Sequence, residues 1–206
     1  MKPNQKFSKL ASSQLIEKTV EALERNGIKA IVVENGSQAK KRVLSILPEG
    51  AEVFTMTSQT AEAINLAKEI NGSKKYNSVR NKLMAMDRNT QGREMVKLGS
   101  SPEFVVGFIH AVTEDGQLLI ASASGSQLPA EAYGGGKAIF LVGTQKIVGD
   151  VQEGLKRIYE YSYPLEDARA QKAYGMRSGV NKILIISKEM IPGRITVILI
   201  KENLGF

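Results

Sequence analysis

The sequence contains no cysteine, no tryptophan and a single histidine, His110. Without cysteine the chain cannot form a disulfide, a thiolate metal site, an iron–sulfur ligand set or a cysteine nucleophile. One histidine cannot build a metal site unaided, so we expect no metal, and no motif predicts a bound cofactor. The absence of cysteine also suits a reducing compartment.

Long hydrophobic runs are absent as well. The apolar run ITVILI at 195–200 is far too short to span a bilayer. The N-terminal residues MKPNQKFSKLASSQLIEK contain no apolar segment of the kind found in signal peptides. These two absences predict a cytoplasmic protein that does not associate with a membrane.

The chain does have an excess of basic residues, with 28 lysines and arginines against 21 acidic residues. Much of this excess lies between Lys74 and Lys97, where seven basic residues stand against two acidic ones. This segment indicates either a solvated helical face or a patch, which includes Arg80, that attracts a phosphate-bearing ligand. Nucleic acid is disfavoured, because no run of aromatic residues is interleaved with the basic ones.

Hydrophobic periodicity predicts alternating helices and strands. Helices are expected at 12–27, 38–47 and 59–70 and on both sides of Pro164, with Ser12 or Ser13, Ser37 and Ser58 as caps. Strands are expected at 28–34, 52–57, 103–113, 117–124, 137–143, 182–189 and 194–202. The Asp115-Gly116 step favours a hairpin, although two successive parallel strands are an open alternative.

This order of elements predicts an α/β fold. Short, nearly continuous apolar strands between helices indicate a Rossmann-like, mostly parallel sheet with helices on both faces. The sequence has no internal repeat and no low-complexity linker, so we expect one domain over 1–206. The basic segment 74–98 is expected to be helical, in two pieces broken near 89–92, and to cover part of that domain.

Small and hydroxyl-bearing residues follow the predicted strands. In open α/β sheets ligands bind at the carboxyl ends of the strands, where such loops let backbone N–H groups approach an oxyanion. A single loop of this kind can be explained by helix capping, whereas several in one sheet favour an anion-binding cleft. The candidate ligand-binding residues are Thr57, Ser58, Arg80, Gly116, Ser122, Ser124, Gly125, Ser126 and Lys146.

The stretch ASASGSQLPAEAYGGGK at 121–137 matches neither common phosphate-binding motif. A P-loop needs glycine where Glu131 stands, and the dinucleotide fingerprint needs a third glycine where Ile139 stands. We therefore expect Gly134–Lys137 to be a turn that enters the next strand. Residues 122–127 have the context of a ligand loop, between a strand and a short helix.

Glu114 is the candidate catalytic residue. A carboxylate at the mouth of a cleft can act as a general base or as a covalent nucleophile. The alternative is a solvated acid in a turn. His110 lies within an apolar run, so a core or edge position is expected for it rather than a catalytic one.

Three segments resemble the LUD-domain family, whose best-known members are lactate utilisation protein C and its relatives. They are TEDGQLL, GSQLPAEAYGGGKAIFLVGTQKIVGDVQEGLKRI and SYPLEDARAQ, and the resemblance covers about 101–170. It implies a fold like that of the glucosamine-phosphate isomerase, ribose-5-phosphate isomerase and CoA-transferase group, in which strand-end loops hold phosphates or CoA. Four residues fall on the family motif: Glu114, Gly116, Gly125 and Lys146.

The resemblance implies an accessory subunit in lactate or other organic-acid oxidation. Such a subunit binds a small anionic or phosphate-bearing ligand, works with iron–sulfur and oxidoreductase subunits, and could form a homo-oligomer. Many relatives have Asn-Arg where this chain has Ser126-Gln127, so any anion-binding role of that arginine is lost or moved. Two alternatives stay open: a stand-alone isomerase or CoA/acyl transferase that uses Glu114, and a non-catalytic module whose basic segment docks an acidic partner.

Overall fold

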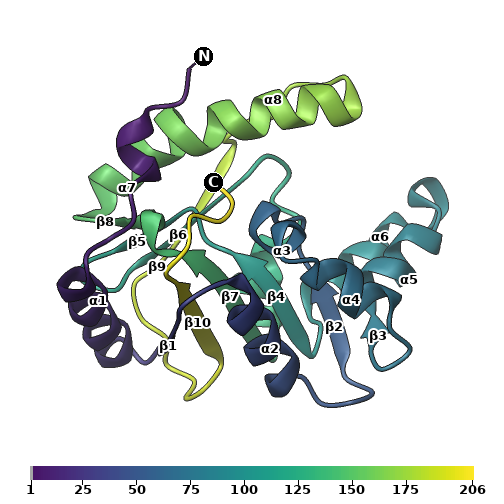
Figure 1. Cartoon of the computed structure of the whole chain (residues 1–206). Coiled ribbons are helices and arrows are strands. Elements are labelled where there is room, and N and C mark those ends of the chain that lie inside the picture. Colours follow the sequence, from purple (N-terminus) through teal and green to yellow (C-terminus); the bar gives the residue numbers. More distant parts are fainter. Residues whose placement is uncertain (1) are drawn as a thin grey trace.

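The computed structural model describes residues 2–206 and contains two β-sheets (Figure 1). The larger sheet has the strand order β1-β10-β7-β4-β2-β3, and every neighbouring pair in it is parallel. Its strands are β1 Lys29–Val33, β2 Glu52–Thr55, β3 Asn77–Ser78, β4 Phe104–Phe108, β7 Lys137–Gly143 and β10 Ile195–Ile200. The predicted α/β fold with a parallel sheet is confirmed.

The smaller sheet has the order β8-β5-β6-β9. Its strands are β5 Ala111–Thr113, β6 Leu118–Ser122, β8 Ile147–Val148 and β9 Lys182–Ile186. β5 and β6 form an antiparallel hairpin, so the hairpin expected at Asp115-Gly116 is confirmed and the parallel alternative is wrong. The prediction of one sheet did not anticipate this second sheet.

Eight α-helices surround the two sheets in the described residues 2–206. They are α1 Ser13–Arg25, α2 Gly36–Ile46, α3 Gln59–Ala63, α4 Leu66–Gly72, α5 Val79–Ala85, α6 Arg88–Ser100, α7 Val151–Arg157 and α8 Tyr163–Tyr174. Within residues 2–206, none of the helices has the length and apolar character needed to cross a membrane.

Three apolar clusters set the layers of the molecule. On one face of the large sheet, Val106 and Ile139 pack with α2, α3 and α4. On its other face, Val105 and Phe140 pack with α1, with the flank formed by α5 and α6, and with the small sheet. The outer face of the small sheet packs on Ile158 and Tyr161 of the segment that follows α7. Helices alone therefore cover one face of the large sheet, whereas helices and the small sheet together cover the other face, where only helices were expected.

The apolar run 103–113, expected to be one strand, is divided between the sheets. β4 ends at Phe108 in the large sheet, and β5 begins at Ala111 in the small one. The chain turns at Ile109-His110, where the His110 N–H donates to the carbonyl of Leu119 in β6. A continuous apolar run does not reveal this break, because residues on both sides of it are buried.

Local caps explain most other differences from the predicted helices. α2 begins two residues earlier than expected, because the side chain of Asn35, rather than that of Ser37, accepts from the Gln38 N–H. The helix expected at 59–70 is divided by Asn65, which has a φ of +53°. The basic segment contains two helices, but its first residues, 74–78, form a turn and strand β3 rather than helix, the helices are separated at 86–87, and only a kink at Gln91 marks the expected break.

Residues 151–174 form one continuous helical arm over the small sheet (Figure 1). The turn Ile158–Ser162 between α7 and α8 is π-helical. Pro164, which lacks an N–H donor, directly follows this π-helical turn, at the start of α8. The arm therefore passes Pro164 without breaking and carries its side chains across the end of both sheets.

Candidate functional site

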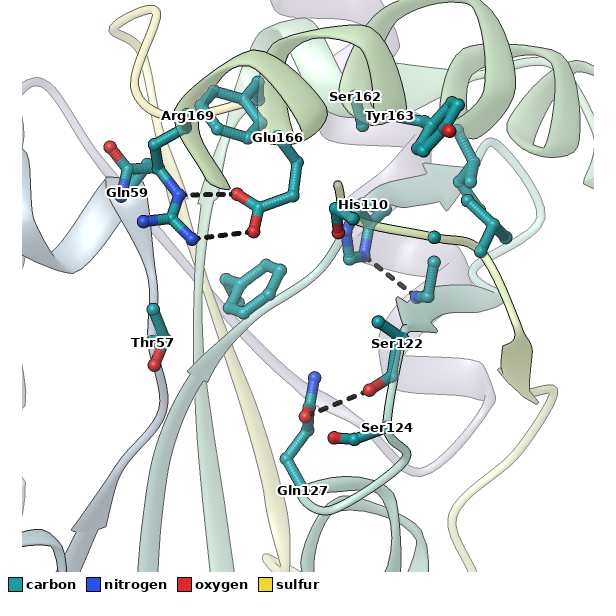
Figure 2. Close-up of a pocket in the computed structure, with 18 of the residues that line it drawn as sticks. Thr57, Gln59, His110, Ser122, Ser124, Gln127, Ser162, Tyr163, Glu166 and Arg169 are labelled. Atoms are coloured by element: carbon teal, nitrogen blue, oxygen red, sulfur yellow. Dashed lines mark hydrogen bonds and ion pairs between the residues drawn. The ribbon is translucent and has the colours of Figure 1, made fainter. Parts of the chain in front are cut away.

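A cavity of about 300 Å³ lies where the carboxyl ends of the large sheet meet the small sheet and the helical arm. The loop after β2 contributes Thr57, Gln59 and Thr60, and the connection between β4 and β5 contributes His110. The end of β6 contributes residues from Ala121 to Gln127, and the arm contributes residues from Ile158 to Tyr174. Figure 2 shows these side chains converging from separate parts of the chain.

Lys146 is the fully buried cation of this cavity. It lies in the short 3-10 turn Thr144–Lys146 after β7, and its Nζ donates to Thr60 Oγ1 at 3.3 Å. Burial, followed by the charge of Arg157, holds the pKa of Lys146 well below its ordinary value. In the described residues 2–206 no carboxylate forms an ion pair with Lys146, so no counter-charge of the protein stabilises its protonated form.

A second fully buried cation, Arg157, lies behind the cavity wall. Its Nη1 donates to the His110 carbonyl at 2.5 Å and to Ser162 Oγ at 2.9 Å. Its Nε and Nη2 have no hydrogen-bond partner among the residues that the structure describes. Burial lowers the pKa of Arg157 to about 10, so it stays charged at neutral pH. Sequence reasoning missed Arg157, because nothing in a helical surface pattern marks an arginine as buried.

His110 lines the same cavity in its neutral form. Burial, with the nearby charges of Lys146 and Arg157, lowers its pKa to about 3. Its Nδ1 accepts from the Ala121 N–H at 3.0 Å, so the proton of the neutral ring is assigned to Nε2. The ring also packs edge-on against Phe108. His110 is therefore a neutral donor in a cavity whose other basic groups are cations.

The loop 122–127 forms one side of the cavity, as the sequence predicted for a ligand loop. Ser122 Oγ accepts from the Gly125 N–H at 2.9 Å and donates to Gln127 Oε1 at 3.2 Å (Figure 2). Ser124, Ser126 and Gln127 also line the cavity. Gly125 has a φ of +82°, which favours glycine, and contacts an adjoining groove rather than this cavity.

The loop after β2 forms the opposite side. Thr57 lines the cavity, and its Oγ1 accepts from Arg80 Nη2 at 3.3 Å. Arg80 also donates from Nε to the Thr55 carbonyl at 2.7 Å, and it lines the adjoining groove. Ser58 is fully buried, and its Oγ accepts from the Ala61 N–H to cap α3, as predicted for a cap. Ser58 does not line the cavity, because its hydroxyl is used inside the loop.

The arm brings an ion pair that was not among the sequence candidates. Arg169 donates from Nε and Nη2 to both carboxylate oxygens of Glu166, at 2.7 and 2.8 Å. Both side chains line the cavity and face the loop that carries Thr57 and Gln59 (Figure 2). Their spacing of three residues was visible in the sequence, but only the position of the arm shows which surface they face.

Glu114 and Gly116 lie elsewhere. They occupy the turn of the β5–β6 hairpin, and Ser122 lies at its other end because the two strands are antiparallel. Glu114 Oε2 is 2.6 Å from Lys18 Nζ, and a side chain at Gly116 would meet the backbone of Ala22 in α1. The expectation that Glu114 and Gly116 lie in the same cleft as the loop 122–127 is therefore wrong.

The cavity also shows no arrangement typical of a metal centre. In residues 2–206, no three or more histidine, cysteine, aspartate or glutamate side chains gather closely enough to hold a metal ion. The cavity instead offers a neutral donor, several hydroxyl groups, and more basic side chains than carboxylates. This arrangement can hold the oxygens of a small anion.

The chain is similar to known proteins over almost all of its length. A family model described as the LUD domain matches residues 16–200. Among solved structures, a DUF162-family protein from Deinococcus radiodurans aligns with a TM-score of 0.58 and 12% identity, over 93% of this chain and 99% of that chain, and so shares the fold. A second structure, eIF2B beta from Chaetomium thermophilum, aligns with a TM-score of 0.39 and 17% identity, over 69% of this chain and 45% of that chain. No curated protein matches the chain.

Proposed function

This chain belongs to the LUD-domain family, and we propose that it binds a small anionic or phosphate-bearing molecule in the cavity around Lys146. One observation carries the proposal. Lys146 is fully buried beside the cavity, and no carboxylate among residues 2–206 pairs with it. A buried ammonium group without a counter-charge is costly, and a bound anion supplies the missing charge.

The surrounding groups fit an anion with several oxygens. The hydroxyls of Thr57 and Ser126, which only accept within the protein, can donate to oxygen acceptors, and so can the neutral ring of His110. Arg157 places a further positive charge behind the wall. Glu166 is already neutralised by Arg169, so it does not repel an incoming anion strongly.

The resemblance to lactate utilisation protein C supports a cellular role as an accessory subunit in lactate or other organic-acid oxidation. In this role the iron–sulfur centre and the oxidoreductase activity reside in partner subunits, because this chain has no cysteine. Co-purification of an iron–sulfur protein with the tagged chain from cells oxidising lactate supports this role. Recovery of the tagged chain without any such partner contradicts it.

Calorimetric titration tests anion binding directly. Lactate, inorganic phosphate and sugar phosphates are titrated into the protein at low ionic strength, and at least one is expected to bind. Lys146→Met keeps the length of the side chain and removes its charge, so affinity is expected to fall by about 100-fold or more. Lys188→Met is the matched control at an exposed lysine, where affinity is expected to stay unchanged. Failure of every anion to bind contradicts the proposal.

Proton uptake provides a second signature of the same site. Burial keeps the pKa of Lys146 low in the free protein, and an anion beside it raises that pKa. Binding is therefore expected to take up protons and to weaken as the pH rises. Titrations in buffers of different ionisation enthalpy measure the uptake, and Lys146→Met is expected to remove it. An uptake that persists in this variant assigns the proton to another group.

A further inference from the structure

The anion cavity continues into a second hollow. An open groove of about 690 Å³ lies between the ends of β2 and β6 and the two helices α5 and α6. Thr57, Ser124, Ser126 and Gln127 line both the cavity and the groove. The two spaces therefore share one polar boundary, and a molecule that leaves the cavity between these side chains enters the groove.

The groove differs chemically from the cavity. Four of the seven methionines of the chain line it, namely Met56, Met84, Met86 and Met95. Met84 is 79% exposed, although it is a large apolar side chain on a helix that also packs on the core. Methionine side chains are flexible and polarisable, and they adapt to apolar partners of varied shape. The groove thus presents an adaptable apolar surface that the described residues leave uncovered.

Two arginines complete the groove. Arg80 is held by Thr55 and Thr57 at the side next to the cavity, and Arg88 lies at the start of α6. No acidic residue lines the groove. Positive charge therefore continues from the cavity along the groove, which favours an anionic ligand over a cationic one throughout.

We propose that the ligand of this chain is an anion with a flexible apolar arm. Its anionic group lies beside Lys146 and the loop 122–127, and its arm crosses the boundary at Thr57 and Gln127 into the methionine-lined groove. This inference rests on the proposed function, because it assigns the anionic group to the same cavity. It adds the substrate class: an alkyl or acyl compound rather than a compact anion such as lactate or inorganic phosphate.

The inference is tested with monoalkyl phosphates, which keep one head group and vary the arm. Ethyl, butyl and hexyl phosphate are titrated into the full chain. Affinity is expected to rise by about threefold for each added methylene, as apolar surface enters the groove. An affinity that does not depend on chain length overturns the inference and leaves the anion cavity intact. Failure of all three compounds overturns the inference, and failure of inorganic phosphate, lactate and sugar phosphates as well overturns the proposed function too.

Paired substitutions locate the arm. Met84→Gln with Met95→Gln makes the groove polar at similar side-chain length and is expected to remove most of the dependence on chain length, while ethyl phosphate still binds. Met176→Gln with Met190→Gln, at two exposed methionines outside the groove, is the matched control and is expected to change neither quantity. Thermal unfolding of both double variants verifies that each one folds.

Two results assign the groove to something else. If Lys146→Met abolishes phosphate binding but leaves hexyl phosphate binding intact, the groove is a separate site and the inference is overturned. If sedimentation shows a dimer that the Met84→Gln, Met95→Gln variant dissociates, while the alkyl series is unchanged, a second copy of the chain covers the groove. Loss of hexyl phosphate binding in Lys146→Met supports one continuous site.

Discussion

The two ends of the β5–β6 hairpin lie in different chemical surroundings. At the turn, Glu114 pairs with the exposed Lys18, and Asn26 donates to the carbonyls of Asp115 and Gly116. At the other end, Ser122 opens a loop beside Lys146, which is buried and has no carboxylate partner among residues 2–206. The turn binds α1 to the small sheet, whereas the opposite end lies at the cavity that contains the buried Lys146.

This difference shows how a site is distinguished from a turn. Both ends carry glycines and polar side chains, and both fall on the same family resemblance. At the turn, the hydrogen bonds and the ion pair are completed within the protein. At the Ser122 end, Lys146 has no carboxylate partner among residues 2–206, which is why we propose a bound anion there. This lack of a partner for a buried basic group, rather than the type of residue, is what makes the Ser122 end the candidate site.

Glycine-to-alanine substitutions are expected to give the largest difference in stability between the two ends of the hairpin. Gly116 has a φ of +84°, and an added Cβ would lie 2.7 Å from the Ala22 carbonyl carbon, so Gly116→Ala is expected to lower the free energy of unfolding by about 3 kcal/mol or more. At Gly125, with a φ of +82°, the atoms nearest to an added Cβ belong to the flexible side chain of Lys182. Gly125→Ala is expected to cost about 1 kcal/mol and to weaken anion binding.

Urea unfolding and phosphate titration of these two variants measure the contrast. The parent protein is the reference for both measurements. Equal losses of stability contradict the rigid packing of the turn on α1. Unchanged phosphate affinity in Gly125→Ala contradicts the role of the loop 122–127 in the site.

The dependence of stability on acid pH tests the state of His110, which lies at the cavity. The pKa of His110 is about 3 in the folded chain and about 6.5 in the unfolded chain, so between these values the unfolded chain binds the additional proton. Stability therefore falls as the pH drops below about 6.5. His110→Asn keeps an acceptor for the Ala121 N–H and removes this titration. At pH 4.5 the variant is expected to lose about 2 kcal/mol less than the parent does, relative to pH 7.

Urea unfolding at pH 7 and at pH 4.5 gives this difference. Glu114→Gln serves as the control because it leaves His110 in place. Protonation of His110 is expected to lower the free energy of unfolding of this variant by the same amount as in the parent. An identical acid dependence in His110→Asn and the parent contradicts the assignment of a buried, neutral ring.

The smallest expected effects come from the two glutamates. Glu114→Gln breaks a surface pair with Lys18 and is expected to change the free energy of unfolding by less than about 0.5 kcal/mol, with unchanged anion affinity. Glu166→Gln removes the carboxylate that neutralises Arg169 inside the cavity and is expected to raise anion affinity by about threefold. Titration of one phosphate into both variants compares them. A large loss of affinity in Glu114→Gln contradicts the structural role of the turn.

Much of the site could be predicted from the sequence because it lies at strand ends. Ser122, Ser124 and Ser126 stand at the end of one predicted strand, and Lys146 follows another, so the rule for parallel sheets placed them near one another. The same rule failed for Glu114. It assumes that each apolar run is one strand of one parallel sheet, and the run 103–113 instead passes from the large sheet into the small one.

Arg157, Glu166 and Arg169 were not predicted, and the reason is physical. Each lies on the helical arm, where charged residues normally face water. Only the packing of the arm across the ends of both sheets turns these three side chains inward. A helical pattern indicates which residues share a face, but it does not indicate what that face meets.

The sequence by itself determined the alternation of helices and strands, the parallel sheet and the hairpin at Asp115-Gly116, because these depend on local periodicity and turn chemistry. The tertiary structure alone decided which end of that hairpin faces the cavity and which cations are buried there. Burial and charge balance arise between segments far apart in the chain. The environment that lowers the pKa of Lys146 and leaves it without a carboxylate partner among residues 2–206 exists only once those segments have packed.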